Sequence, residues 1–369
     1  MKRYAWLTAI AGLLFAAACS GGDSDEAAPT VAPTAETTSP STTEANTTTT
    51  ELPATSTIPA ASSTTTTLPT VARMPLTGAP LTDADEIPDR PALVVKLTNA
   101  GPEPLPQAGL NSADIVIEEV IESQVSRLAA VFHSVGSDPV GPVRSGRAQD
   151  INVMLAFDAP LFAWSGGNAA VTRAIRSSDL VDLSAVHTPG YYRRQARTAP
   201  NDLYSSTEVL WGHTTDEAGR PSPVFPYVAP GDEIDGDEAT DIVIRFDSTE
   251  VRWGYDEESG RYFRHQNGAP HNTEESDGVE QVWADNIVVM LADYGENVFD
   301  GNPDAQVLGS NPVLVFTDGK VQEGVWLRFE PTDPFGLFDN VEDLNELVLQ
   351  PGRTWLEIPR NVDGTVAWE

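Results

Sequence analysis

The chain has little cysteine and little positive charge. Cys19 is the single cysteine in 369 residues, so the sequence excludes an intrachain disulfide and a metal site built from several thiolates. Only 22 lysines and arginines stand against 55 aspartates and glutamates, which gives a formal net charge of −33. A surface this acidic repels phosphate backbones, so we expect no nucleic-acid partner. The five histidines lack the spacing of metal ligands, and we expect neither a metal nor another cofactor.

The segment that ends at Cys19 has the composition of an export signal. Lys2 and Arg3 precede an uncharged apolar run over residues 4–18, which has about the length of a signal-peptide hydrophobic region and is too short to span a membrane comfortably. The run ends in Ala-Ala-Ala-Cys, which resembles a lipobox, where the cysteine receives a lipid with palmitate-type chains. We therefore predict a lipoprotein signal peptide over residues 1–19 and a lipid anchor on Cys19 at the outer face of the cytoplasmic membrane. A secretory signal cut just before that cysteine is the alternative.

A low-complexity segment follows the cysteine. Residues 20–70 are almost entirely Ser, Thr, Ala, Pro, Gly and acidic residues, with no Phe, Trp or Tyr. Such a segment cannot bury enough apolar surface to offset the entropy of ordering the chain. We predict a disordered stalk over residues 20–73.

The remaining sequence predicts an α+β fold in two domains. Runs of β-branched residues over 92–97, 115–120 and 125–134 are bounded by turn residues and predict strands, whereas apolar spacing over 147–157 predicts a helix. Residues 221–241 are rich in Pro, Gly and acid, and nearly every later element is a predicted strand.

We place an N-terminal domain with a mixed α/β sheet at residues 74–225 and a β-rich antiparallel domain at residues 241–369. Asp318-Gly319 is the strongest hairpin turn of the second domain.

Polar residues interrupt the apolar runs of the first domain. Strand alternation over 115–122 puts Glu119 among apolar neighbours, and a buried carboxylate needs a partner. Arg127, Arg144 and Arg147 are available. Two interpretations stay open: a structural network of arginines and carboxylates, or an arginine-lined pocket that grips an anionic or polyhydroxyl ligand through planar bidentate bonds.

Signals for an enzyme are weak. The chain lacks the sequence motifs of serine hydrolases, zinc proteases and P-loop proteins. Ser145, His133 and an aspartate supply the residue types of a catalytic triad, but these residue types occur in any chain of this length. A pair among Glu118, Glu119 and Glu122 could hydrolyse a glycoside. However, the spacing of two carboxylates along one strand does not distinguish a glycosidase from a protein without this activity.

Several motifs together resemble the YerB-like bacterial lipoproteins. The most specific is Gly-Pro-Val-Arg-Ser-Gly-Arg at 141–147, and others are Pro-Gln-Ala-Gly-Leu at 106–110, Ala-Asp-Ile-Val at 113–116 and Gly-Arg-Thr-Trp at 352–355. The resemblance covers nearly all of the predicted folded region and implies an N-terminal α+β domain, a smaller β-rich C-terminal domain and an unassigned activity. The family usually has Gly-Gly where this chain has Ser123-Gln124, and a His-Asn pair where this chain has Asn201-Asp202.

These observations favour an exported, lipid-anchored envelope protein with a binding or scaffolding role. Its partners would be the membrane, through the lipid on Cys19, and a cell-wall or envelope protein component. A cell-wall or carbohydrate hydrolase that uses carboxylates near Glu119 is the alternative. The candidate ligand-binding residues are Asn99, Gln107, Glu119, Glu122, Arg127, Arg144, Ser145, Arg147, Arg193 and Asn201.

Overall fold

The computed structural model describes residues 2–3, 72–101, 103, 105–299 and 301–369. Cys19 and nearly all of the predicted signal peptide and stalk therefore lie outside the described residues. In the described part of the chain, no helix is long and apolar enough to cross a membrane.

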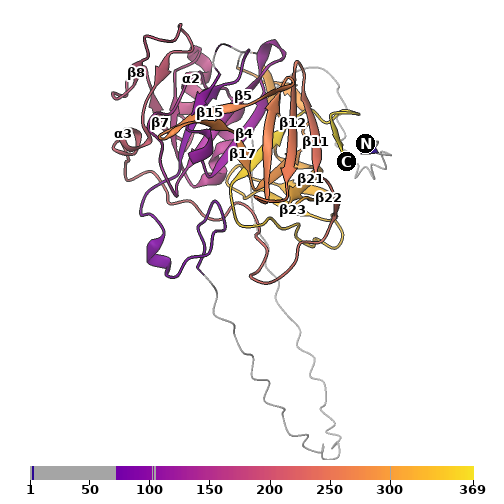
Figure 1. Cartoon of the computed structure of the whole chain (residues 1–369). Coiled ribbons are helices and arrows are strands. Elements are labelled where there is room, and N and C mark those ends of the chain that lie inside the picture. The colour runs from indigo at the N-terminus through magenta and orange to yellow at the C-terminus, as the bar shows by residue number, and fades with distance from the viewer. Residues whose placement is uncertain (1, 4–71, 102, 104, 300) are drawn as a thin grey trace, which may run out of the picture. The chain divides into compact units, whose positions relative to one another are not determined.

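Eleven strands form the largest sheet of the described chain, here called the main sheet (Figure 1). In sheet order they are β10 (Asp237–Glu238), β22 (Lys320–Arg328), β21 (Gly309–Thr317), β18 (Asn286–Met290), β24 (Thr354–Ile358), β4 (Ile115–Val120), β5 (Ser126–Phe132), β2 (Leu93–Thr98), β6 (Leu161–Trp164) and β7 (Val181–Ser184), with β23 (Gly336–Phe338) paired to β22. The hairpin predicted at Asp318-Gly319 is confirmed, because β21 and β22 pair antiparallel across these two residues, and both have the positive φ that a tight hairpin turn requires.

The main sheet combines strands from both predicted domains. The join is between β4 and β24, which run parallel with Ile117 opposite Leu356. The strand β24 is also parallel to β18, although the sequence predicts an antiparallel second half. The domain boundary at residues 226–240 stays a prediction, since both sides of it contribute to one continuous sheet.

A second, antiparallel sheet packs against one face of the main sheet. Its strands are β1 (Lys2–Arg3), β25 (Val366–Trp368), β11 (Asp241–Phe246), β12 (Thr249–Asp256), β13 (Arg261–Gln266) and β14 (Ala269–Pro270), with β17 (Trp283–Ala284) paired to β13. Buried and exposed residues alternate along β12, and its inward Trp253 meets Trp355 of the main sheet edge-on at 5.2 Å between ring centres. Apolar burial between the sheets therefore forms the first of two cores.

Some of the short helices, together with loops, cover the opposite face of the main sheet, whereas Leu110, Leu210 and Trp211 of two other helices pack into the first core. The α-helices are α1 (Gln149–Met154), α2 (Ala169–Arg176) and α3 (Thr207–Trp211), and the 3-10 helices are η1 (Ala84–Glu86), η2 (Leu110–Ser112), η3 (Glu122–Gln124) and η4 (Leu155–Phe157). Asn168 caps α2 by accepting hydrogen bonds from the backbone of Ala170 and Val171. Apolar residues of α1, η4 and α2 pack on β4 and β5 and form the second core.

Three smaller sheets complete the structure. They are β16 (Gly278–Gln281) with β15 (Asn272–Glu275) and β3 (Gln107–Ala108), then β19 (Tyr294–Glu296) with β20 (Pro303–Ala305), and β8 (Tyr192–Arg193) with β9 (Leu203–Tyr204). With few helices beside many strands, the predicted α+β class is confirmed.

The turn between β4 and β5 holds two residues in a left-handed conformation. Ser123 has φ 66° and Gln124 has φ 60°, and the resemblance places Gly-Gly at these two positions. A left-handed conformation costs an L-residue roughly 1–2 kcal/mol and costs glycine almost nothing. A glycine at either position would remove this cost. It would also give the unfolded chain more conformational entropy, which offsets part of the stability gained.

We therefore expect Ser123→Gly and Gln124→Gly each to raise the free energy of unfolding, by about 0.5–1 kcal/mol. Urea unfolding of each variant beside the parent chain measures this. Gln124→Ala is the matched control and should give no gain, because alanine keeps the Cβ. A loss of stability in both glycine variants would contradict the strain argument.

Candidate functional site

The segment 141–147 carries two candidate arginines along the edge of strand β2. Its backbone bonds to neighbours on both sides: Arg144 N donates to Lys96 O at 2.8 Å, and Val143 N donates to Leu203 O at 2.7 Å. Ser165 N in turn donates to Arg144 O at 2.9 Å. These bonds fix the segment where the side chains of Arg144 and Arg147 approach β5.

Arg127, Arg144 and Arg147 then form what we call the arginine cluster. Arg127 is 3% exposed and donates from Nη1 to Ser145 O at 2.9 Å. Burial lowers the pKa of Arg127 to about 9, and repulsion from Arg147 and Arg144 adds to the effect while Glu122 opposes it. Burial, followed by repulsion from Arg147, also lowers the pKa of Arg144. Three guanidinium groups are thus held close together in a partly dehydrated place.

Glu122 is the acidic partner of the cluster. Arg147 donates to it from Nε at 2.7 Å and also from Nη2, in a bidentate ion pair. Burial opposes ionisation, but the hydrogen bond and charge of Arg147 outweigh it and lower the pKa of Glu122. Arg127 and Arg144 have no such pair: within the described chain, the buried Nε atom of each lacks a hydrogen-bond partner.

A cleft of about 440 Å³ opens beside Arg144. It is lined by Val143, Arg144, Ser165, Ala185, Val186, Tyr191, Tyr192, Arg193, Pro200 and Leu203. Arg193 is paired with Asp202 at 2.5 Å, yet its side chain is 61% exposed. Ser145 is connected to the lining through a 3.5 Å contact between its hydroxyl and that of Ser165. Asn201 directly follows the lining residue Pro200.

Glu119 lies deeper, in what we call the buried triad of Lys96, Glu119 and Asp150. Lys96 Nζ lies 2.6 Å from Asp150 Oδ1 and also bonds to Glu119 Oε1, and all three side chains are 0% exposed. Burial raises the pKa of Glu119 to about 7, and the charge of Asp150 adds to this while Lys96 opposes it. A substrate cannot reach a carboxyl group with no exposed surface, so the geometry gives no support to a hydrolase that acts through Glu119.

Asn99 and Gln107 belong to a separate cluster on the opposite face of the main sheet, here called the Glu118 network. Glu118 accepts from Asn99 Nδ2 at 2.8 Å and forms an ion pair with Arg264 at 2.5 Å, both fully buried. Gln107 Oε1 lies 2.7 Å from His271 Nε2. The two candidates are therefore structural partners of Glu118 and do not join the arginine cluster.

The sequence interpretation missed three members of the Glu118 network. Arg264 also donates to His271 Nδ1, so this ring is neutral and carries its proton on Nε2; burial, then the charge of Arg264, lowers its pKa well below 6.5. Glu357 accepts from Trp253 Nε1 at 2.9 Å. Burial, then the charge of Glu118, raises the pKa of Glu357 well above its ordinary value.

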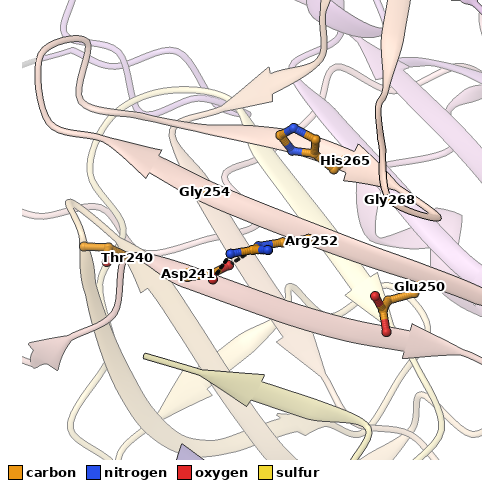
Figure 2. Close-up of a pocket in the computed structure, with 7 residues that line it drawn as sticks. All are labelled: Thr240, Asp241, Glu250, Arg252, Gly254, His265 and Gly268. Atoms are coloured by element: carbon orange, nitrogen blue, oxygen red, sulfur yellow. Dashed lines mark hydrogen bonds and ion pairs between the residues drawn. The ribbon is translucent and has the colours of Figure 1, made fainter. Parts of the chain in front are cut away.

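A second hollow, of about 410 Å³, lies on the outer face of the second sheet (Figure 2). Thr240, Asp241, Glu250, Arg252, Gly254, His265 and Gly268 line it. Figure 2 shows Arg252 directed at Asp241, its ion-pair partner. Because its arginine is already neutralised, this hollow is a weaker candidate for an anion than the cleft beside Arg144.

Comparison with known proteins agrees with this architecture. The N-terminal domain model described as "Protein of unknown function (DUF3048)" matches residues 76–220, and the corresponding C-terminal domain model matches residues 242–356. A Bacillus subtilis (strain 168) protein named "Putative lipoprotein YerB" is 26% identical over 286 residues, which cover 74% of this chain and 82% of that protein. The crystal structure of YerB protein from Bacillus subtilis superposes with a TM-score of 0.68 at 24% identity, covering 80% of this chain and 99% of that one.

Proposed function

The chain belongs to the DUF3048 family, whose function is unknown, and from this premise we propose that it is an exported envelope protein that binds an anionic glycan in the cleft beside Arg144. The expected resemblance to the YerB-like proteins is thereby confirmed. In this proposal Cys19 carries a lipid, and the predicted stalk holds the binding domain away from the outer face of the cytoplasmic membrane.

One observation carries the binding role: Arg144 of the arginine cluster lines the cleft and forms no ion pair with any described residue. Glu122 pairs with Arg147 alone, and the buried Nε atoms of Arg127 and Arg144 have no partner among the described residues. The two Nε atoms themselves have no exposed surface, so a ligand would reach the cluster through the part of the Arg144 side chain that lines the cleft. An anion placed beside Arg144 would supply both the charge and the hydrogen-bond acceptors.

The cleft lining suits a ligand that is part anion and part sugar. Arg144 offers a planar fork that matches carboxylate and phosphate groups, whereas Arg193 is already paired with Asp202. Tyr191 and Tyr192 line the same cleft, and Tyr192 is 43% exposed, so its ring can pack against a sugar face. Soluble peptidoglycan fragments, which carry carboxylates on a glycan, combine these two properties.

Isothermal titration of the full chain with soluble peptidoglycan fragments tests the binding role. Arg144→Ala should weaken binding by about 10- to 100-fold, because a charged hydrogen bond contributes roughly 1.5–3 kcal/mol. Arg144→Lys keeps the charge but loses the fork and should recover only part of the affinity. Arg252→Ala, in the hollow on the second sheet, is the matched control. Equal binding by the parent and Arg144→Ala would overturn the proposal, as would the absence of binding by the parent.

The lipid anchor has its own test. Cells that express the full chain are fed an alkyne fatty acid, and we expect the protein to be labelled and to fractionate with membranes. Cys19→Ser should lose the label completely and release the protein from the membrane fraction. Continued labelling of the Cys19→Ser protein would show that this cysteine is not the lipid site.

A further inference from the structure

The buried triad brings an amine and two carboxyl groups together with no solvent-exposed surface. Lys96 comes from β2, Glu119 from β4 and Asp150 from the start of α1. Each side chain is fully buried, and Lys96 Nζ contacts both carboxyl groups, with 2.6 Å to Asp150 Oδ1. An amine within hydrogen-bond distance of a carboxyl oxygen, in a fully buried and fixed geometry, is placed for reaction as well as for attraction.

The proton count of the triad allows that reaction. One ammonium and two carboxylates leave a net negative charge, and burial raises the pKa of Glu119 to about 7. Near neutral pH Glu119 is therefore able to hold a proton. Lys96 Nζ is hydrogen-bonded to both carboxyl groups, so a proton shift along either bond leaves the neutral amine that the reaction requires.

The surroundings supply the remaining requirements. Ala129, which lies opposite Lys96 in the sheet, and Ile117, two residues before Glu119, are fully buried apolar neighbours, while Arg127 lies opposite Glu119. Arg147 N donates to Asp150 Oδ2 at 2.7 Å. A backbone N–H at this oxygen stabilises the charge that develops when a nucleophile adds to the carboxyl carbon.

We propose that Lys96 and Asp150 become joined by an intramolecular amide bond, with Glu119 transferring the protons. The neutral amine of Lys96 adds to Asp150 Cγ and forms the N–C bond. Glu119 gives its proton to the departing oxygen and receives one from the nitrogen, so it ends unchanged. The C–O bond breaks and one water molecule leaves, and the atoms balance without an oxidant, a reductant or any other reactant.

Such a bond would close residues 96–150 into a covalent ring. The ring contains β4, β5 and the segment 141–147, which carries Arg144 and Arg147. A chain with a single cysteine has no intrachain disulfide to restrict its unfolded state, and a side-chain amide provides an equivalent constraint. This inference is independent of what the cleft binds.

Peptide mass spectrometry of the purified full chain, digested with trypsin, is the direct test. Acylated lysine resists trypsin, so we expect peptide 74–127 joined to peptide 148–173, with a mass one water below that of the two together. Asp150→Asn should give the same linked product, because ammonia leaves in place of water. Lys96→Arg keeps the positive charge and should lose the linked product completely, and Glu119→Gln should slow or abolish its formation.

The result that overturns the proposal is equally specific. Peptides 74–96, 97–127 and 148–173 would be recovered separately, with unchanged masses, from folded parent chain incubated at neutral pH. A linked product in Lys96→Arg would also exclude Lys96 as the nucleophile. Because the parent and Asp150→Asn must share one product mass, the test stands even if Lys96→Arg or Glu119→Gln fails to fold.

Discussion

Arg264→Ala should lower the free energy of unfolding by about 3–5 kcal/mol, the range for removing one partner of a buried ion pair. Arg264 and Glu118 are both 0% exposed and lie 2.5 Å apart. The guanidinium also packs on the ring of Trp355, at 4.7 Å from the ring centre. The substitution leaves the Glu118 carboxylate buried without its counter-charge and leaves His271 Nδ1 without its donor.

Urea unfolding followed by tryptophan fluorescence measures this loss. Arg252→Ala is the matched control, because Arg252 lies on the adjacent strand β12 in an exposed ion pair with Asp241, and such pairs contribute at most about 1 kcal/mol. If Arg264→Ala costs no more than Arg252→Ala, the Glu118 network does not stabilise the junction of the two sheets.

Glu357→Gln should raise the free energy of unfolding at pH 7, by up to about 3 kcal/mol. Glu357 is fully buried, and its pKa is well above the ordinary value because of burial first and then the charge of Glu118. Above the ordinary pKa, the unfolded chain releases this proton while the folded chain retains it. Each further pH unit therefore costs the folded state about 1.4 kcal/mol until the folded pKa is reached.

Glutamine mimics the protonated carboxyl, since its amide can donate to Glu118 while its oxygen accepts from Trp253 Nε1. The gain should vanish near pH 4, where both states of the parent hold the proton, and should grow as the pH rises. Unfolding curves of parent and variant at pH 4, 5.5 and 7 check this. A difference that does not change with pH would show that Glu357 is ionised in the folded protein.

The sequence predicts local structure well where one segment determines it. The β-branched run over 115–120 coincides with β4, and the apolar spacing over 147–157 contains α1 and η4. The arginines near Glu119 and Glu122 are also close to them in sequence, and the structure brings this group together, with Arg127 directly opposite Glu119 in the sheet. Short sequence separation made that convergence predictable.

The Glu118 network was not predictable in the same way, because its members are far apart in the chain. Glu118 and Arg264 are separated by 146 residues, and only the packing of the second sheet on the first brings them together. Alternation gives a partial signal: Arg264 shares a face of β13 with the buried Tyr262, so its side chain is directed inward. Lys96 gives a similar signal as a lone charge within an apolar strand.

The binding proposal depends on whether Arg144 serves a ligand or the fold, and one paired measurement separates these roles. Urea unfolding and titration with soluble peptidoglycan fragments are carried out on the same preparations of the parent and Arg144→Ala. Arg144 is half-buried and its Nη1 contacts only Pro200 O, at 3.3 Å, among the hydrogen bonds of the described chain. We predict a stability loss below about 1 kcal/mol together with a 10- to 100-fold loss of affinity. A stability loss of about 3–5 kcal/mol with unchanged affinity would show that Arg144 is a structural member of a buried network and would contradict the account.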